Sequence, residues 1–110
     1  MVMHLYDRNF KSIKEGTKTI EKRLNDDKRR NLKKGDIVKL VNIADDEALD
    51  VEVVDLHKYD SFEELYKHFD KVSMGYKEDE NADPKDMEKY YSKEEQQLYG
   101  VVGIEIKRIW

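Results

Sequence analysis

The chain has 110 residues, of which 38% are apolar and 42% are charged, and its formal net charge is −4. This length suits one compact domain over residues 1–110 with a modest core, and it is too short for two domains. The chain has no cysteine, which excludes a disulfide framework, a thiol nucleophile and a zinc knuckle, and no apolar run approaches the roughly 20 residues of a membrane-spanning helix. Because the first residues also lack the features of a signal peptide, we expect a soluble cytoplasmic protein.

The charges are distributed unevenly along the chain. Residues 1–40 contain twelve Lys or Arg and six Asp or Glu, a balance of +6, whereas residues 41–110 contain nine and nineteen, a balance of −10. A polyanion responds to the local field, so the basic first third can face phosphates while the acidic remainder faces water. Charge alone leaves equally open that the dense charge only keeps a small domain in solution.

The first quarter of the chain predicts a strand, a helix and a second strand. Residues 4–6 are a short strand candidate, and Asp7 can cap the helix that follows. Gly16 is a natural left-handed end for that helix. Residues 17–24 alternate between polar and apolar side chains and contain two threonines, which is typical of a strand.

Three later segments predict further strands. Residues 37–43 and 49–56 form a hairpin around the acidic turn at 45–47, and the second segment alternates with a period of two, so one face is buried. Residues 101–109 are the most apolar stretch of the chain, and we expect them to form a central strand.

The remaining segments predict helices and one loop. Asn25 or Asp26 can cap a helical turn, and the capping boxes that begin at Ser61 and Ser92 predict two helices. The Asp83-Pro84 pair predicts another helix start, and residues 70–83 before it predict an irregular loop. This order of elements fits an α+β fold, a small curved sheet or β-barrel with peripheral helices.

Residues 18–23 hold the densest group of candidate site residues. Successive side chains of a strand point to opposite faces, so Glu21 and Arg23 share one face while Ile20 anchors the other in the core. The bend at Gly16 can turn Lys18 toward Glu21 and Arg23. The three charged groups can then hold a phosphate or a base edge, with Lys18 as donor, base or nucleophile. Spacing alone does not exclude a salt-bridge ladder on a solvated face.

Residues 16–23, Gly-Thr-Lys-Thr-Ile-Glu-Lys-Arg, match the Gly-x-Lys-x-x-Glu-x-Arg signature of the ASCH domain, a relative of the PUA RNA-binding fold. Residues 24–30, 35–36, 90–94 and 99–104 also resemble a small bacterial subgroup of that family, so the resemblance covers most of the chain. It implies a small PUA-like β-barrel with peripheral helices. It also implies a cleft, lined by Lys18, Glu21 and Arg23, that binds RNA or a nucleotide in RNA metabolism or translation-linked regulation.

The same resemblance leaves an enzyme as the alternative. Some family members process RNA, and one branch resembles amidohydrolases that deacetylate acetylated cytidine, which would make Lys18 and Glu21 a catalytic pair in a ribonuclease or an amidohydrolase. In that branch a threonine stands three residues after the lysine, whereas this chain has Glu21 there. A carboxylate at this position would pair with Lys18 and hold its positive charge, which counts against deacetylation.

Three further residues are candidates for ligand contact, each with a structural alternative. Asn25 can hydrogen-bond a ligand or cap a turn, and Arg30 can grip a backbone phosphate or remain solvated. Tyr90 and Tyr91 can stack on an unstacked base, and we expect one of them, Tyr91 in our assignment, at the cleft and the other in the core. The three histidines have no ligand-like spacing and no phosphate-cradling glycine loop is present, so we expect neither a metal nor another cofactor. Nothing in the sequence indicates the oligomeric state.

Overall fold

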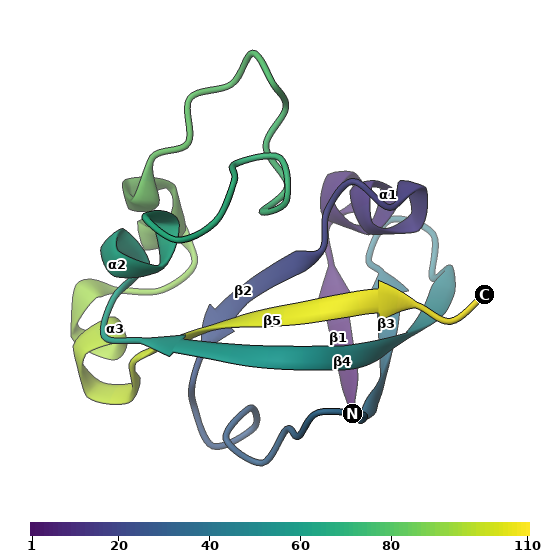
Figure 1. Ribbon diagram of the computed structural model, residues 1–110, viewed down its shortest axis with the longest axis horizontal. Helices are drawn as coiled ribbons and strands as arrows, with labels where there is room; N and C mark the ends of the chain where they lie inside the picture. Colours follow the sequence, from purple (N-terminus) through teal and green to yellow (C-terminus); the bar gives the residue numbers. More distant parts are fainter.

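Five strands form one curled sheet in the order β1-β3-β4-β5-β2 (Figure 1). The computed structural model describes residues 1–110. Strands β1 and β3 are parallel and the other neighbouring pairs are antiparallel. The sheet is a half-barrel, which confirms the predicted α+β, PUA-like barrel class. The strand bounds are β1 (Val2–Leu5), β2 (Ile20–Leu24), β3 (Ile37–Asn42), β4 (Ala48–Tyr59) and β5 (Val101–Arg108).

Four short helices surround this sheet. The side-chain caps predicted at Ser61 and Ser92 both form, since their hydroxyls accept from backbone amides three residues on and Ser92 completes a full capping box. The segment after Asp83 is a 3-10 helix, whose one buried residue is Met87. The helix bounds are α1 (Asp7–Glu15), α2 (Phe62–Tyr66), η1 (Pro84–Lys89) and α3 (Lys93–Tyr99).

Two predicted caps are wrong. Asp7 is the first residue of α1 rather than the cap of this helix. The Asp7 carboxylate instead accepts a hydrogen bond of 2.9 Å from the side-chain amide of buried Asn42. The polar segment after β2 forms a hydrogen-bonded turn in which the backbone carbonyl of Asp26 accepts from the amides of Arg29 and Arg30. The hydrogen bonds of this turn thus go to a backbone carbonyl, and not to a side chain of Asn25 or Asp26 as the sequence predicted.

The apolar side chains form two clusters. The larger lies inside the half-barrel and contains twelve buried residues from β1, α1 and the strands β3, β4 and β5, together with Leu32. The smaller lies between β2 and the helices α2 and η1. Its seven buried members are Ile20, Leu24, Phe62, Leu65, Met74, Met87 and Val101.

The two edge strands of the sheet, β1 and β2, come together at the open side of the half-barrel. Nη2 of Arg23 on β2 donates a hydrogen bond of 3.0 Å to the carbonyl oxygen of His4 on β1. A side chain therefore bridges the seam that no backbone ladder closes.

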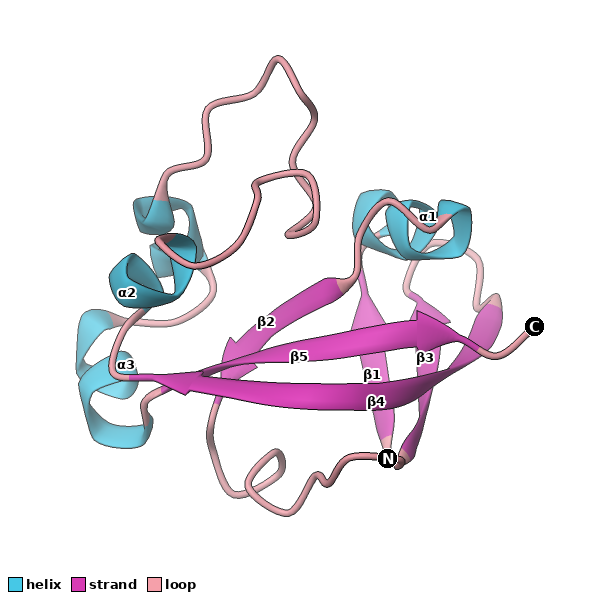
Figure 2. Cartoon of the chain, in the orientation of Figure 1, coloured by secondary structure: helices cyan, strands magenta, loops and turns pink.

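The irregular loop predicted over residues 70–83 begins three residues earlier and spans residues 67–83, drawn as a long coil between α2 and η1 in Figure 2. The loop returns to the sheet at Ser73, whose carbonyl oxygen accepts from the amides of Thr19 and Ile20, both at 2.9 Å. These bonds fix the loop against the start of β2 and so place it beside the seam.

Candidate functional site

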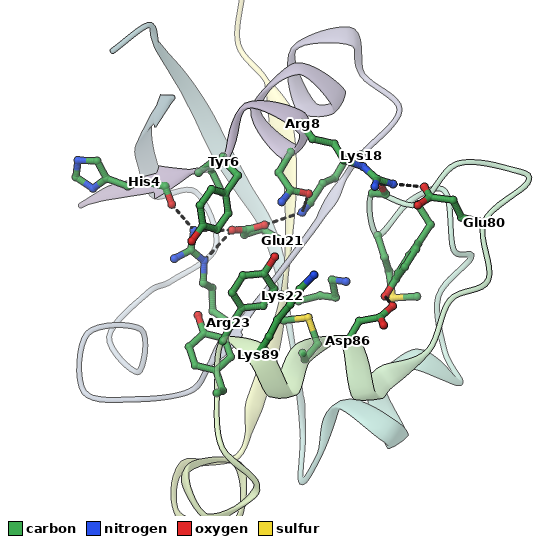
Figure 3. Close-up of a pocket in the computed structure, with 18 residues that line it drawn as sticks. His4, Tyr6, Arg8, Lys18, Glu21, Lys22, Arg23, Glu80, Asp86 and Lys89 are labelled. Carbon is green, nitrogen blue, oxygen red and sulfur yellow. Dashed lines mark hydrogen bonds and ion pairs between the residues drawn. The ribbon is translucent and has the colours of Figure 1, made fainter. Parts of the chain in front are cut away.

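A pocket of about 400 Å³ lies at the seam between β1 and β2 (Figure 3). Residues from β1, α1, β2, the 67–83 loop and η1 line it. Five lysine or arginine side chains and three carboxylates are among these residues. The pocket is therefore basic although the chain as a whole carries a net charge of −4.

A buried ion network forms one side of the pocket. Oε1 of Glu21 lies 2.8 Å from Nζ of Lys18, and Oε2 lies 2.7 Å from Arg23. Lys18 and Glu21 are only 3% and 4% exposed, and the Lys18 ammonium also donates to Oδ1 of Asn9 at 3.0 Å. The structure thus brings Lys18, Glu21 and Arg23 together as the motif predicts, but within the protein rather than on a solvated face.

The charge state of Glu21 follows from these contacts. Burial alone raises the pKa of a carboxyl, but the two neighbouring cations, Lys18 ahead of Arg23, outweigh it and lower the pKa of Glu21 to about 2. Glu21 is consequently ionised at neutral pH. The three groups together carry one net positive charge.

The local chain path explains why Lys18 faces Glu21. Gly16 adopts a φ of +91° that ends α1, and the amides of Thr17 and Lys18 then donate to the carbonyl of Ser12 at 3.1 Å each. This tight return delays the start of β2 to Ile20 and turns Lys18 inward. It also explains why β2 is shorter than the strand predicted over residues 17–24.

Gly75 of the loop packs directly against Lys18. A Cβ atom at this position would lie 3.0 Å from Cδ of Lys18 and 3.1 Å from Oδ1 of Asn9. The loop tip is held from the other side by Arg8, which pairs with Glu80 and lies near the Gly75 carbonyl. The loop therefore covers Lys18 and forms one wall of the pocket.

Lys22 also lines this pocket, although it alternates with Glu21 and Arg23 along β2. Its ammonium donates a hydrogen bond of 2.8 Å to the hydroxyl of Tyr66. The hydroxyls of Tyr66 and Tyr76 are hydrogen-bonded to each other at 2.8 Å, and the Tyr76 hydroxyl donates to the Asp86 carboxylate at 2.7 Å. Burial, followed by the positive charge of Lys18, lowers the pKa of Lys22 to about 7. Lys22 is a pocket residue that the sequence did not reveal as one.

The two adjacent tyrosines both line the pocket, so the prediction that one of them is confined to the core is wrong. Tyr91 is half-buried and its ring stacks on Phe62 with centroids 6.0 Å apart. Tyr90 is exposed and ends η1 as its C-terminal cap. Tyr91 thus combines a packing contact with a place at the pocket wall.

Two predicted ligand residues lie outside this pocket. Asn25 lines a separate depression with Tyr59 and Tyr99, and its backbone amide donates to the carbonyl of Gly100 at 3.0 Å. Arg30 is exposed and lies 3.4 Å from Asp27. A ligand role for Asn25 and Arg30 stays a prediction, and it would require a ligand that extends beyond the pocket.

Nowhere do three or more His, Asp or Glu side chains gather in a way that could hold a metal ion. None of the helices combines the length and the apolar character that crossing a bilayer requires.

The fold agrees with the comparison with known proteins. The family model described as "ASCH domain" matches residues 3–109, and the chain belongs to this family, which is generally linked to RNA binding. The crystal structure of hypothetical protein PH0355 is similar, with 31% identity, coverage of 98% of this chain and 97% of that one, and a TM-score of 0.82. The solution structure of protein PF0455 from Pyrococcus furiosus has 29% identity, coverage of 98% and 96%, and a TM-score of 0.76. No curated protein matches the chain.

Proposed function

We propose that the pocket at the seam binds RNA or a nucleotide, and that the protein acts in RNA metabolism or translation-linked regulation. The observation that carries this proposal is the position of Arg23, which Glu21 and the His4 carbonyl hold in place at the pocket wall. A guanidinium fixed in this way loses little side-chain entropy when it binds a phosphate or a base edge.

The donors of Arg23 support this role. Its hydrogen bonds to Glu21 and to the His4 carbonyl go through Nε and Nη2, so Nη1 takes part in neither, and Tyr91 lies close enough to interact with the guanidinium. Tyr91 offers a ring to a base, and exposed Lys89 adds a cation at the rim. One pocket can thus accommodate both an anion and an aromatic base. Its volume falls within the range of roughly 300–1,000 Å³ that is usual for small-ligand sites.

The same geometry favours binding over catalysis by Lys18 and Glu21. A lysine nucleophile must present a neutral amine to its substrate, whereas the Lys18 ammonium is buried and bonded to Glu21 and Asn9. A general base must accept a proton near neutral pH, whereas the pKa of Glu21 is about 2. Both groups therefore suit a fixed electrostatic role better than a reactive one.

Binding of a labelled single-stranded RNA of mixed sequence, followed by fluorescence anisotropy at several salt concentrations, tests the proposal. We expect affinity to fall as salt rises, and each lost phosphate contact to reduce the logarithmic slope by roughly 0.7. Arg23→Gln and Lys89→Gln should weaken binding, while Lys107→Gln, which removes one charge from an exposed site outside the pocket, should not. Circular dichroism verifies that each variant is folded. Equal affinity of all three variants and the parent would overturn the proposal.

A parallel incubation addresses the enzyme alternative. The pure protein is mixed with RNA and, separately, with acetylated cytidine, and the products are separated by chromatography. We expect no turnover above that of Glu21→Gln. Product that forms with the parent and disappears in the variant would show that the ion network is catalytic instead.

A further inference from the structure

Two tyrosines at the mouth of the pocket differ from the other five in the chain. Tyr6, between β1 and α1, is 57% exposed, and Tyr90, directly after η1, is 43% exposed, whereas the remaining tyrosines are all half-buried. Both residues line the pocket, and neither hydroxyl has a hydrogen-bond partner within the protein. Packing in the core therefore does not explain why aromatic residues stand here.

The two rings form a single surface. Their centroids lie 6.0 Å apart and their planes are inclined by 37°, although Tyr6 and Tyr90 are 84 positions apart in the chain. Nζ of Lys89 lies 5.3 Å from the centroid of the Tyr90 ring. Figure 3 shows Tyr6 beside Arg23 at the edge of the pocket. Aromatic faces and a cation thus occur together at the mouth of the pocket proposed for a nucleotide.

We propose that Tyr6 and Tyr90 form a stacking platform for the nucleobase next to the nucleotide held in the pocket, and that the ligand is a single-stranded oligonucleotide. This inference rests on the proposed function of the pocket. A pocket of about 400 Å³ has room for little more than one nucleotide, so a neighbouring residue of the ligand must lie at the mouth. The platform offers that residue two ring faces, and Lys89 lies close enough to contact the connecting phosphate.

The chemistry of the platform selects single strands. In a duplex the bases are stacked on one another, and their faces cannot reach a protein ring. Stacking on tyrosine also depends little on which base is present, because every base has a π-face. The platform therefore adds affinity for a chain of nucleotides without adding a strong sequence preference.

Calorimetric titration with matched ligands separates the platform from the pocket. The ligands are the four 5′-phosphorylated mononucleotides, the four corresponding 5′-phosphorylated homodinucleotides, and dinucleotides whose second residue lacks its base. The abasic ligands carry the extra phosphate without the extra ring, so they isolate stacking from charge. We expect the dinucleotides to bind roughly ten- to a hundredfold more tightly than the abasic ligands, in line with measured base–aromatic stacking.

Variants assign that gain to the two rings. Tyr6→Ala and Tyr90→Ala should each reduce dinucleotide affinity much more than mononucleotide affinity, and Tyr6→Phe and Tyr90→Phe should preserve it because the ring remains. Trp110→Ala is the matched control, since the 54% exposure of Trp110 lies between those of the two tyrosines but Trp110 does not line the pocket. Arg23→Gln should weaken the binding of all the ligands by a similar factor.

The outcomes distinguish the two proposals. If mononucleotides bind and dinucleotides bind no more tightly than their abasic forms, the platform is disproved and the pocket remains. Equal losses for mononucleotides and dinucleotides in the alanine variants would likewise disprove the platform, because the rings would then belong to the pocket itself. If no nucleotide binds at all, both proposals fail, and the exposed tyrosines would have to serve a protein partner.

Discussion

The carboxylate of Glu21 and the ammonium of Lys18 lie 2.8 Å apart in a part of the molecule that water hardly reaches. Burial of an ion pair is costly, and Arg23 and Asn9 supply the additional bonds that offset the cost. The network is therefore a rigid structural unit as well as a charged wall. Its main consequence is that Arg23 is held in place before any ligand arrives.

The first prediction concerns the stability of this network. Glu21→Gln leaves Lys18 and Arg23 without their shared anion, and breaking a buried pair in this way costs about 3–5 kcal/mol in the free energy of unfolding. Urea denaturation measures the loss. Glu64→Gln is the control, because its pair with Lys67 is exposed to solvent and should contribute little to stability. Similar losses in the two variants would show that burial does not strengthen the network.

The second prediction concerns acid. The pKa of Glu21 is lowered from 4.5 to about 2 in the folded protein, so the folded state binds this proton less tightly than the unfolded state. The stabilisation that ionised Glu21 contributes to the folded state is accordingly present above pH 4.5 and is lost as the pH falls towards 2. We expect the difference in unfolding free energy between the parent and Glu21→Gln to shrink over this range. Taking the difference matters because other carboxyls with lowered pKa values, such as Asp7 and Glu80, titrate in both proteins. A difference independent of pH would contradict the assignment.

The third prediction concerns Lys22. Burial, and then the charge of Lys18, lowers its pKa from 10.5 to about 7, so folding disfavours the protonated amine. The free-energy cost of burying the protonated amine is full below pH 7. It disappears as the pH rises to 10.5, since Lys22 also loses its proton in the unfolded chain at that pH. Lys22→Met should therefore stabilise the protein more at pH 6 than at pH 10.

Urea denaturation at both pH values checks the behaviour of Lys22. The groups that surround its amine are Tyr66, Tyr76, Asp86 and Arg8, together with the ion network on β2. Lys107→Met, at an exposed position of β5, is the control and should show little dependence on pH. A gain for Lys22→Met that is the same at pH 6 and pH 10 would rule out a titrating lysine.

The sequence predicted the parts of this molecule that depend on local geometry. Alternating apolar residues located the strands, because a period of two places one face in the core whatever the strand pairs with. The same period placed Glu21 and Arg23 on one face. The bend at Gly16 and the ASCH signature added Lys18, which lies in the same segment of six residues.

Contacts made across the fold could not be predicted in this way. Lys22 meets Tyr66 of α2 and Tyr76 of the 67–83 loop only because both segments fold back against β2. The carbonyl of His4, which fixes Arg23, is a backbone group and leaves no trace in the sequence. The bulge between Val53 and Asp55 on β4 also interrupts an alternation that looked continuous.

The last prediction concerns Gly75, where the loop meets Lys18. Its φ of +106° is strained for any residue with a Cβ, and that atom would also lie 3.0 Å from the Lys18 side chain. Lys18 cannot move aside, because its ammonium is fixed by Glu21 and Asn9. Left-handed strain costs about 1–2 kcal/mol and overpacking about 1–3 kcal/mol, so Gly75→Ala should lower the free energy of unfolding by about 2–5 kcal/mol.

Gly35→Ala separates these two effects. Gly35 has a similar φ of +89°, but nothing lies within 4 Å of the added Cβ atom. We expect it to lose only the strain of about 1–2 kcal/mol, and to bind RNA as the parent does. Gly75→Ala should in addition weaken RNA binding, because the displaced loop opens the wall beside Lys18. If both variants lose the same stability, the backbone conformation alone requires glycine at Gly75, and the loop does not clamp Lys18.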